Sequence, residues 1–133
     1  MLILAKTEFD SVIGAFTPLS IKKGYGGHQS DKKGFTFLFS LTNEDKYSLT
    51  NNKKAFEITP IGSGPSFGDK DFSIGNNAST MQTSRFDLGN TFQIPEKYES
   101  KQEAIKSFIG AKGNEKQVNS MIRLKEWEVF QVY

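Results

Sequence analysis

The stretch Phe35-Thr36-Phe37-Leu38-Phe39-Ser40-Leu41 is the clearest strand signal in the sequence. Its large apolar residues recur at every second position, which is the period of a β-strand with one buried face. Four side chains are therefore expected to face the core: Phe35, Phe37, Phe39 and Leu41. Leu38 adds an apolar group to the opposite face, so this strand is predicted to lie in the centre of its sheet.

Shorter strand signals surround this stretch on both sides. Three pairs of them are separated by residues that favour tight turns, and each pair is predicted to form a hairpin. The pairs are residues 2–6 with 12–16, residues 47–50 with 55–61, and residues 85–88 with 91–94. Residues 72–74 are predicted to be a further short strand, and the Gly-rich residues 62–68 a rigid loop.

The chain ends in a long apolar stretch, residues 122–133, which is predicted to be one strand. Ile122 and Leu124 share one face of that strand, whereas Trp127 and Val129 share the other. Such a change of parity requires either that both faces are covered or that a bulge lies near Lys125-Glu126. Trp127 is expected to be a core residue.

One helix is predicted, over residues 100–109. Ser100 and Glu103 have the spacing of a capping box, and Gly110 stands where a left-handed residue commonly ends a helix. Its apolar face consists of Ala104, Ile105, Phe108 and Ile109. Many short strands with one or two short helices predict a mainly β fold, an antiparallel two-sheet β-sandwich.

Composition excludes several classes of function. The chain has 133 residues, and 17 Lys and Arg against 15 Asp and Glu leave a net charge of only +2. This interleaved charge argues against a nucleic-acid partner. No apolar run approaches the roughly 20 residues that cross a membrane, so we expect no membrane insertion and an intracellular, cytoplasmic protein. The absence of Cys excludes disulfides and thiol chemistry.

No catalytic constellation is recognisable in the sequence. His28 is the only histidine, and it has no Cys or second His with which to form a zinc site. The carboxylate pairs Asp69/Asp71 and Glu126/Glu128 have a spacing of two, which places each pair on one face of a strand and is weak evidence for a metal. Residues 62–68 lack the helix and Lys of a phosphate-binding loop. We therefore predict no catalytic residue, no cofactor and no metal.

Several motifs, taken in order, resemble the TLDc domain, the module of the oxidation-resistance proteins. They extend from Val12-Ile13-Gly14-Ala15-Phe16 through Gly64-Pro65-Ser66-Phe67-Gly68 to Glu126-Trp127-Glu128-Val129-Phe130. The Gly-Pro-x-Phe-Gly loop and the closing Glu-x-Glu-Val-Phe strand are the most specific parts. The motif residues are Gly14, Gly64, Pro65, Phe67, Gly68, Glu126, Glu128 and Phe130.

This resemblance implies a two-sheet sandwich with no established catalytic site and a role in resistance to oxidative stress. It also implies a protein partner, since some members bind and regulate the vacuolar proton-pumping ATPase. Residues 1–133 resemble a single TLDc domain without its N-terminal part. We therefore expect an open sheet edge, with self-association through it.

Two loops are the candidates for binding a partner, because function concentrates in loops carried by a rigid scaffold. Residues 22–33 place lysines around a Gly-rich tip that suits an acidic surface, and residues 62–71 offer an aromatic anchor beside carboxylates. The alternative is that Phe67 packs under its own loop and that the lysines are only solvated. The candidate residues are Lys22, Lys23, Lys32, Lys33, Phe67, Asp69 and Asp71. A protein-interaction module is the favoured function; a lectin-like ligand-binding sandwich and a cryptic enzyme are the alternatives.

Overall fold

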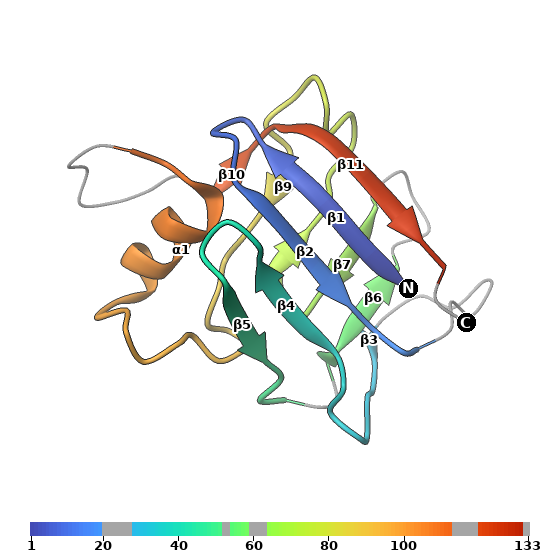
Figure 1. Cartoon of the computed structure of the whole chain (residues 1–133). Coiled ribbons are helices and arrows are strands. Elements are labelled where there is room, and N and C mark those ends of the chain that lie inside the picture. Colours follow the sequence, from blue (N-terminus) through green and yellow to red (C-terminus); the bar gives the residue numbers. More distant parts are fainter. Residues whose placement is uncertain (20–27, 52–53, 59–63, 113–119, 132–133) are drawn as a thin grey trace.

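Two antiparallel sheets packed face to face form the structure, a computed structural model (Figure 1). It describes residues 1–19, 28–51, 54–58, 64–112 and 120–131. The five-stranded sheet has the order β11-β1-β2-β4-β5, and the six-stranded sheet has the order β10-β9-β8-β7-β6-β3. The predicted two-sheet sandwich is confirmed.

The five-stranded sheet contains the N-terminal hairpin and the end of the chain. Its strands are β1 (Leu2–Thr7), β2 (Val12–Phe16), β4 (Phe37–Ser40), β5 (Asp45–Ser48) and β11 (Leu124–Phe130). The six-stranded sheet consists of β3 (His28–Gln29), β6 (Phe56–Ile58), β7 (Pro65–Phe67), β8 (Phe72–Ser73), β9 (Ser84–Arg85) and β10 (Met121–Ile122). The predicted hairpin at the N-terminus is confirmed as β1 and β2.

The predicted inner face of the 35–41 stretch is wrong. Phe35 and Leu41 lie outside β4 and are 60% and 57% exposed, while Leu38 is fully buried. Phe37 and Phe39 are half-buried on the outer face of the sheet. The register explains the reversal, because Leu38 lies between Ala15 and Tyr47, which are both fully buried. Side chains that pair across strands share a face, so the neighbours of Leu38 decide which side is the core.

Gly14 allows Phe39 to lie on the outer face. The two residues pair across β2 and β4. A Cβ atom on Gly14 would lie 2.3 Å from Cζ of Phe39 and 2.4 Å from the carbonyl oxygen of Ile3. Only glycine fits beneath this ring, which gives the motif residue Gly14 a structural role.

The other two predicted hairpins do not form. β5 belongs to the five-stranded sheet and β6 to the six-stranded sheet, so these two strands do not pair. Only β9 forms from the 85–94 region; Phe92 instead makes an isolated bridge with Leu49. Within the Gly-rich loop, Pro65–Phe67 is a strand, β7, with partners on both sides. The loop prediction for these three residues is therefore wrong.

The long C-terminal strand is divided between the sheets. β10 pairs with β9, and β11 pairs with β1. The register of β1 and β11 shifts where Lys6 pairs with Glu126 and Thr7 pairs with Leu124, which leaves Lys125 as the extra residue of a bulge. Of the two expected alternatives, covered faces or a bulge, the structure has the bulge. Trp127, expected in the core, is 37% exposed on the edge strand.

The helix α1 (Lys101–Ile109) confirms the prediction in detail. The side chain of Ser100 accepts a hydrogen bond from the Glu103 N–H, and Gly110 ends the helix at φ 82°. All four predicted apolar residues are buried: Ala104, Ile105, Phe108 and Ile109. The hydroxyls of Thr7 and Ser11 donate to the carbonyls of Ile109 and Phe108, which ties the helix end to the turn between β1 and β2.

Replacing Ser100 with alanine is expected to lower the free energy of unfolding by about 0.5–2 kcal/mol. The substitution removes the acceptor of the Glu103 N–H at the first turn of α1. Urea denaturation of the two proteins measures the loss. A substitution to threonine, which retains the acceptor oxygen, should recover most of it; no difference between alanine and serine would contradict the capping role.

The core between the sheets is built from aromatic rings. Phe72 is central to it, with ring centroids 5.8 Å from Phe67, 5.1 Å from Phe86 and 6.3 Å from Phe108. Phe108 carries the contact to the other sheet, where its ring lies edge-on to Tyr47 at 5.2 Å. Among the described residues, no helix is both long and apolar enough to cross a membrane.

Candidate protein-interaction surface

Asp71 organises the loops at one end of the six-stranded sheet. Its carboxylate accepts hydrogen bonds from the backbone N–H groups of Asp69, Asn90, Thr91 and Phe92, at 2.9–3.1 Å. The side chain is fully buried. Gly68 leaves room for this carboxylate. Its φ is 67°, and a Cβ atom on it would lie only 2.6 Å from Oδ1 of Asp71. Asp71 therefore joins the end of β7 to residues 90–92.

Burial raises the pKa of the Asp71 carboxyl above its ordinary value, and the backbone N–H donors oppose this shift. Both carboxylate oxygens accept bonds from within the chain. Asp71 is thus a loop-organising residue and has no surface to offer a partner, contrary to its place among the candidate contacts. Asp69, two residues earlier, is exposed.

Phe67 is also a core residue rather than the exposed anchor expected of it. It has no exposed surface, and its ring lies 5.0 Å from that of Phe56. Gly64 and Pro65, which belong to the same motif, also have structural roles. Gly64 packs against Ile74, where a Cβ would lie 2.9 Å from the Cβ of that residue, and Pro65 begins β7 opposite Ile58. Proline suits the first position of a strand because it lacks a donor.

The basic loop is described in part. Lys22 and Lys23 lie outside the described residues, whereas Lys32 and Lys33 are exposed. Asp31 fixes this part of the loop: its carboxylate accepts from the N–H groups of Lys33, Gly34 and Thr36 and from the Thr36 hydroxyl. His28, next to the loop, pairs with Glu57 in β3 and β6.

Acidification is expected to remove the contribution of Asp31 to stability. Burial alone would raise the pKa of Asp31, but the hydrogen bonds from Thr36 and the loop N–H groups outweigh it, and the pKa lies below its ordinary value. A lowered folded-state pKa stabilises the fold above about pH 4, and this stabilisation is lost as the pH falls through the folded-state pKa.

Denaturation of the native protein and of Asp31→Asn at pH 6 and pH 3 tests this prediction. The native protein should be the more stable at pH 6, and the difference should shrink at pH 3. A difference that stays constant between the two pH values would contradict it.

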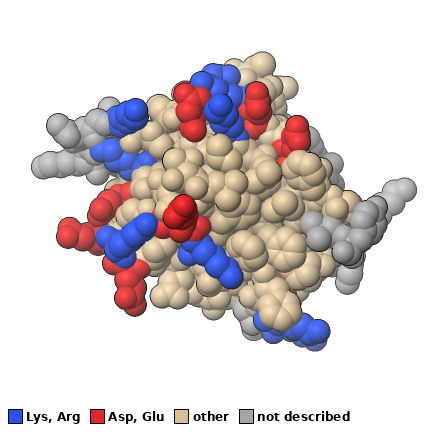
Figure 2. Space-filling view, in the orientation of Figure 1, with Lys and Arg blue, Asp and Glu red and all other residues tan. Residues whose placement is uncertain are grey.

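The outer face of the five-stranded sheet carries a cluster of aromatic side chains, here called the outer aromatic face: Phe16, Phe35, Phe37 and Phe39. The ring centroids of Phe16 and Phe37 are 5.4 Å apart, and those of Phe37 and Phe39 are 6.0 Å apart. Nζ of Lys46 lies 4.5 Å from the centroid of Phe37. Figure 2 shows a large uncharged area on the side of the molecule that carries this sheet, with charged side chains along its margin and a few within it.

A shallow hollow of about 290 Å³ is lined by three of these rings, Phe16, Phe35 and Phe37, together with Lys46. Phe35, Phe37 and Phe39 were expected in the core, so this surface was missed in the sequence. The sequence did carry a signal for this surface, because both faces of two strands are apolar. In β2, Ala15 is followed by Phe16, and in β4, Phe37 is followed by Leu38. Two apolar faces on one sheet mean that one of them is either covered by another layer or available to a partner.

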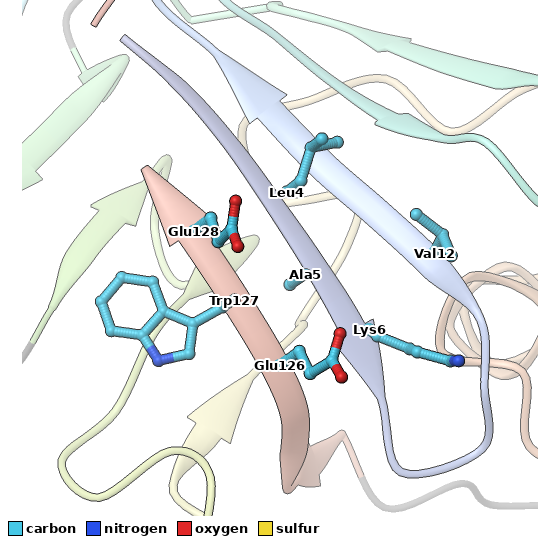
Figure 3. Close-up of a pocket in the computed structure, with 7 residues that line it drawn as sticks. All are labelled: Leu4, Ala5, Lys6, Val12, Glu126, Trp127 and Glu128. Atoms are coloured by element: carbon cyan, nitrogen blue, oxygen red, sulfur yellow. The ribbon is translucent and has the colours of Figure 1, made fainter. Parts of the chain in front are cut away.

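The motif residues of β11 lie at the edge of the same sheet. Glu126 and Glu128 line a second shallow hollow, of about 260 Å³, together with Leu4, Lys6 and Val12 (Figure 3). Trp127 points away from the two carboxylates. A lectin-like site would require the aromatic ring and the carboxylates on one face, so these three residues do not form one. Phe130 is 40% exposed at the end of the strand.

No curated protein and no solved structure matches the chain at a significant level. The family model of the TLDc domain matches residues 1–133, which is the whole chain. The chain therefore belongs to the TLDc domain family.

Proposed function

We propose that this protein is a non-catalytic protein-interaction module that acts in resistance to oxidative stress. Membership of the TLDc family suggests an interaction module of this kind. The observation that carries the proposal is the outer aromatic face, in which Phe35 is 60% exposed beside three half-buried rings. Clustered exposed apolar side chains with a charged rim are typical of protein-binding surfaces, and aromatic residues are enriched in them.

The composition supports a role without catalysis. A direct peroxide scavenger usually depends on a thiol, a metal or a cofactor, and the sequence has no Cys and a single His. The loop residues Gly64, Gly68 and Asp71 organise the backbone rather than present reactive groups at the surface. We propose the vacuolar proton-pumping ATPase as the partner, on the basis of the family resemblance.

Affinity capture tests the proposal. The full chain is used to capture proteins from extracts of resting and oxidised cells, and pump subunits are expected in the captured set. Phe35→Glu should reduce their recovery at least fivefold, because it places a charge in the outer aromatic face. Met81→Glu is the matched control, since Met81 is 52% exposed elsewhere on the molecule.

Both substitutions change exposed side chains and should alter the free energy of unfolding by no more than about 0.5 kcal/mol. Equal recovery with Phe35→Glu and Met81→Glu would remove the outer aromatic face from the interaction. Capture of other proteins without pump subunits would reject the pump as partner, and capture of no protein would reject the interaction module itself.

A further inference from the structure

We propose that the free edge of β11 binds an extended strand of another protein, in which Lys or Arg alternates with apolar residues. This inference rests on the proposed function and names a second contact surface with its partner chemistry. Among the described strands, β11 pairs with β1 alone and forms one end of the five-stranded sheet. It is seven residues long, and its last six residues are exposed.

An edge strand of this length presents a row of backbone N–H and C=O groups to any chain that can pair with it. Strand addition uses those groups for affinity and the alternating side chains for specificity. The chemistry of the two faces of β11 therefore indicates which strand fits.

The inner face of β11 is apolar and uncovered. Its Trp127 and Val129 are 37% and 47% exposed. Their partners on β1 are Ala5 and Ile3, which are 3% and 0% exposed. Within β11 only Leu124 is buried, so along residues 125–130 the buried core ends at β1, although Trp127 and Val129 are apolar. A strand that places apolar residues beside Trp127 and Val129 would extend the core by one strand.

The outer face of β11 is acidic. Glu126 and Glu128 stand on the same side of the strand, and both are exposed (Figure 3). Glu126 lies opposite Lys6 on β1, whereas Glu128 lies opposite Leu4. In the part of the chain that the structure describes, neither carboxylate forms a salt bridge. Opposite charges on neighbouring strands stabilise a sheet, so the fitting strand carries Lys or Arg at two alternate positions.

The same carboxylates disfavour a second copy of this chain. Two copies of β11 that pair antiparallel are related by a two-fold axis. The residue numbers of every two partners across the axis therefore add up to the same value. Centring the pair on residue 127 places Glu126 opposite Glu128. Centring it on residue 126 or 128 places a glutamate opposite its own copy. Like charges directly opposite one another destabilise a sheet, so β11 selects a different chain over itself.

A synthetic seven-residue peptide that alternates valine and lysine, blocked at both ends, tests the site. Trp127 is the only tryptophan of the chain and lies on the proposed contact face, so its fluorescence reports binding directly. The expected result is a saturable blue shift that weakens as salt increases. Three control peptides should not produce it: one with glutamate for lysine, one with the same residues in two blocks, and one with N-methylated amides along one edge.

Charge reversal on the protein provides the second arm. Glu126→Lys with Glu128→Lys should weaken binding of the lysine peptide at least tenfold and create binding of the glutamate peptide. Glu96→Lys with Glu99→Lys is the matched control, because both residues are exposed and the net charge changes equally. This control should bind the lysine peptide within twofold of the native protein.

Several results would overturn the inference. The first is a Trp127 fluorescence spectrum that the lysine peptide leaves unchanged although the protein is folded. The second is binding of the block peptide as tight as that of the alternating peptide. The third is a dimer in which the β11 amides become protected from hydrogen exchange as the protein concentration rises. The last result would assign the edge to a second copy. If the protein with Glu126→Lys and Glu128→Lys still captures every partner, strand addition at β11 is rejected, whereas the proposed function as an interaction module is retained. If the native chain captures no partner, the proposed function fails whatever the peptide does.

Discussion

Replacing Asp71 with alanine is expected to lower the free energy of unfolding by about 3–5 kcal/mol, at the upper end for a single substitution. The carboxylate accepts the N–H groups of Asp69, Asn90, Thr91 and Phe92, and it is fully buried. Without it the N–H groups of Asn90, Thr91 and Phe92 lose their acceptor in a region that water does not reach easily, whereas the Asp69 N–H keeps the Thr91 hydroxyl. Equilibrium urea denaturation measures the effect.

Asp69→Ala is the matched control for this prediction. Asp69 is exposed, and only its backbone takes part in the network around Asp71. Its removal should change stability by no more than about 0.5 kcal/mol. Similar losses for the two alanine variants would show that the Asp71 carboxylate does not organise these loops.

Truncation of Phe72 to alanine is expected to cost about 3–5 kcal/mol, because it removes a fully buried ring from the centre of the core. The rings of Phe67, Phe86 and Phe108 surround it and cannot all move to fill the space. Thermal and urea denaturation measure the loss. Partial loss of secondary structure at ordinary temperature would agree with the larger end of this range.

Phe35→Ala separates this core from the outer aromatic face. Phe35 is 60% exposed, so its truncation should cost little stability even though the residue is the same amino acid. A large loss from Phe35→Ala, or a small loss from Phe72→Ala, would contradict the assignment of core and surface.

Local signals in the sequence were sufficient for the elements whose formation depends on near neighbours. Helix α1 was predicted with its cap and its buried face, because Ser100, Glu103 and Gly110 act within one turn of the backbone. The hairpin of β1 and β2 was also predicted, and the bulge at Lys125 was one of two alternatives, since alternation and its interruption are visible in a single strand.

Errors arose where distant residues decide the outcome. Phe67 and Asp71 were offered as contacts for a partner because function concentrates in loops, with burial of Phe67 under its own loop as the alternative. The structure buries both of them, since Phe67 forms part of β7 and Asp71 collects donors from 19 to 21 residues away. No local pattern shows which loops will meet.

The sequence by itself determined the fold class, the helix and the family, because alternation, capping and ordered motifs are properties of the chain read in order. Only the tertiary structure decided which face of the 35–41 stretch is the core, and which sheet receives β5 and which β6. The physical reason is that a strand with apolar residues on both faces has no preferred side of its own. Leu38 became the inner residue because Ala15 and Tyr47 bury it from both sides, and the phenylalanines were thereby left on the surface.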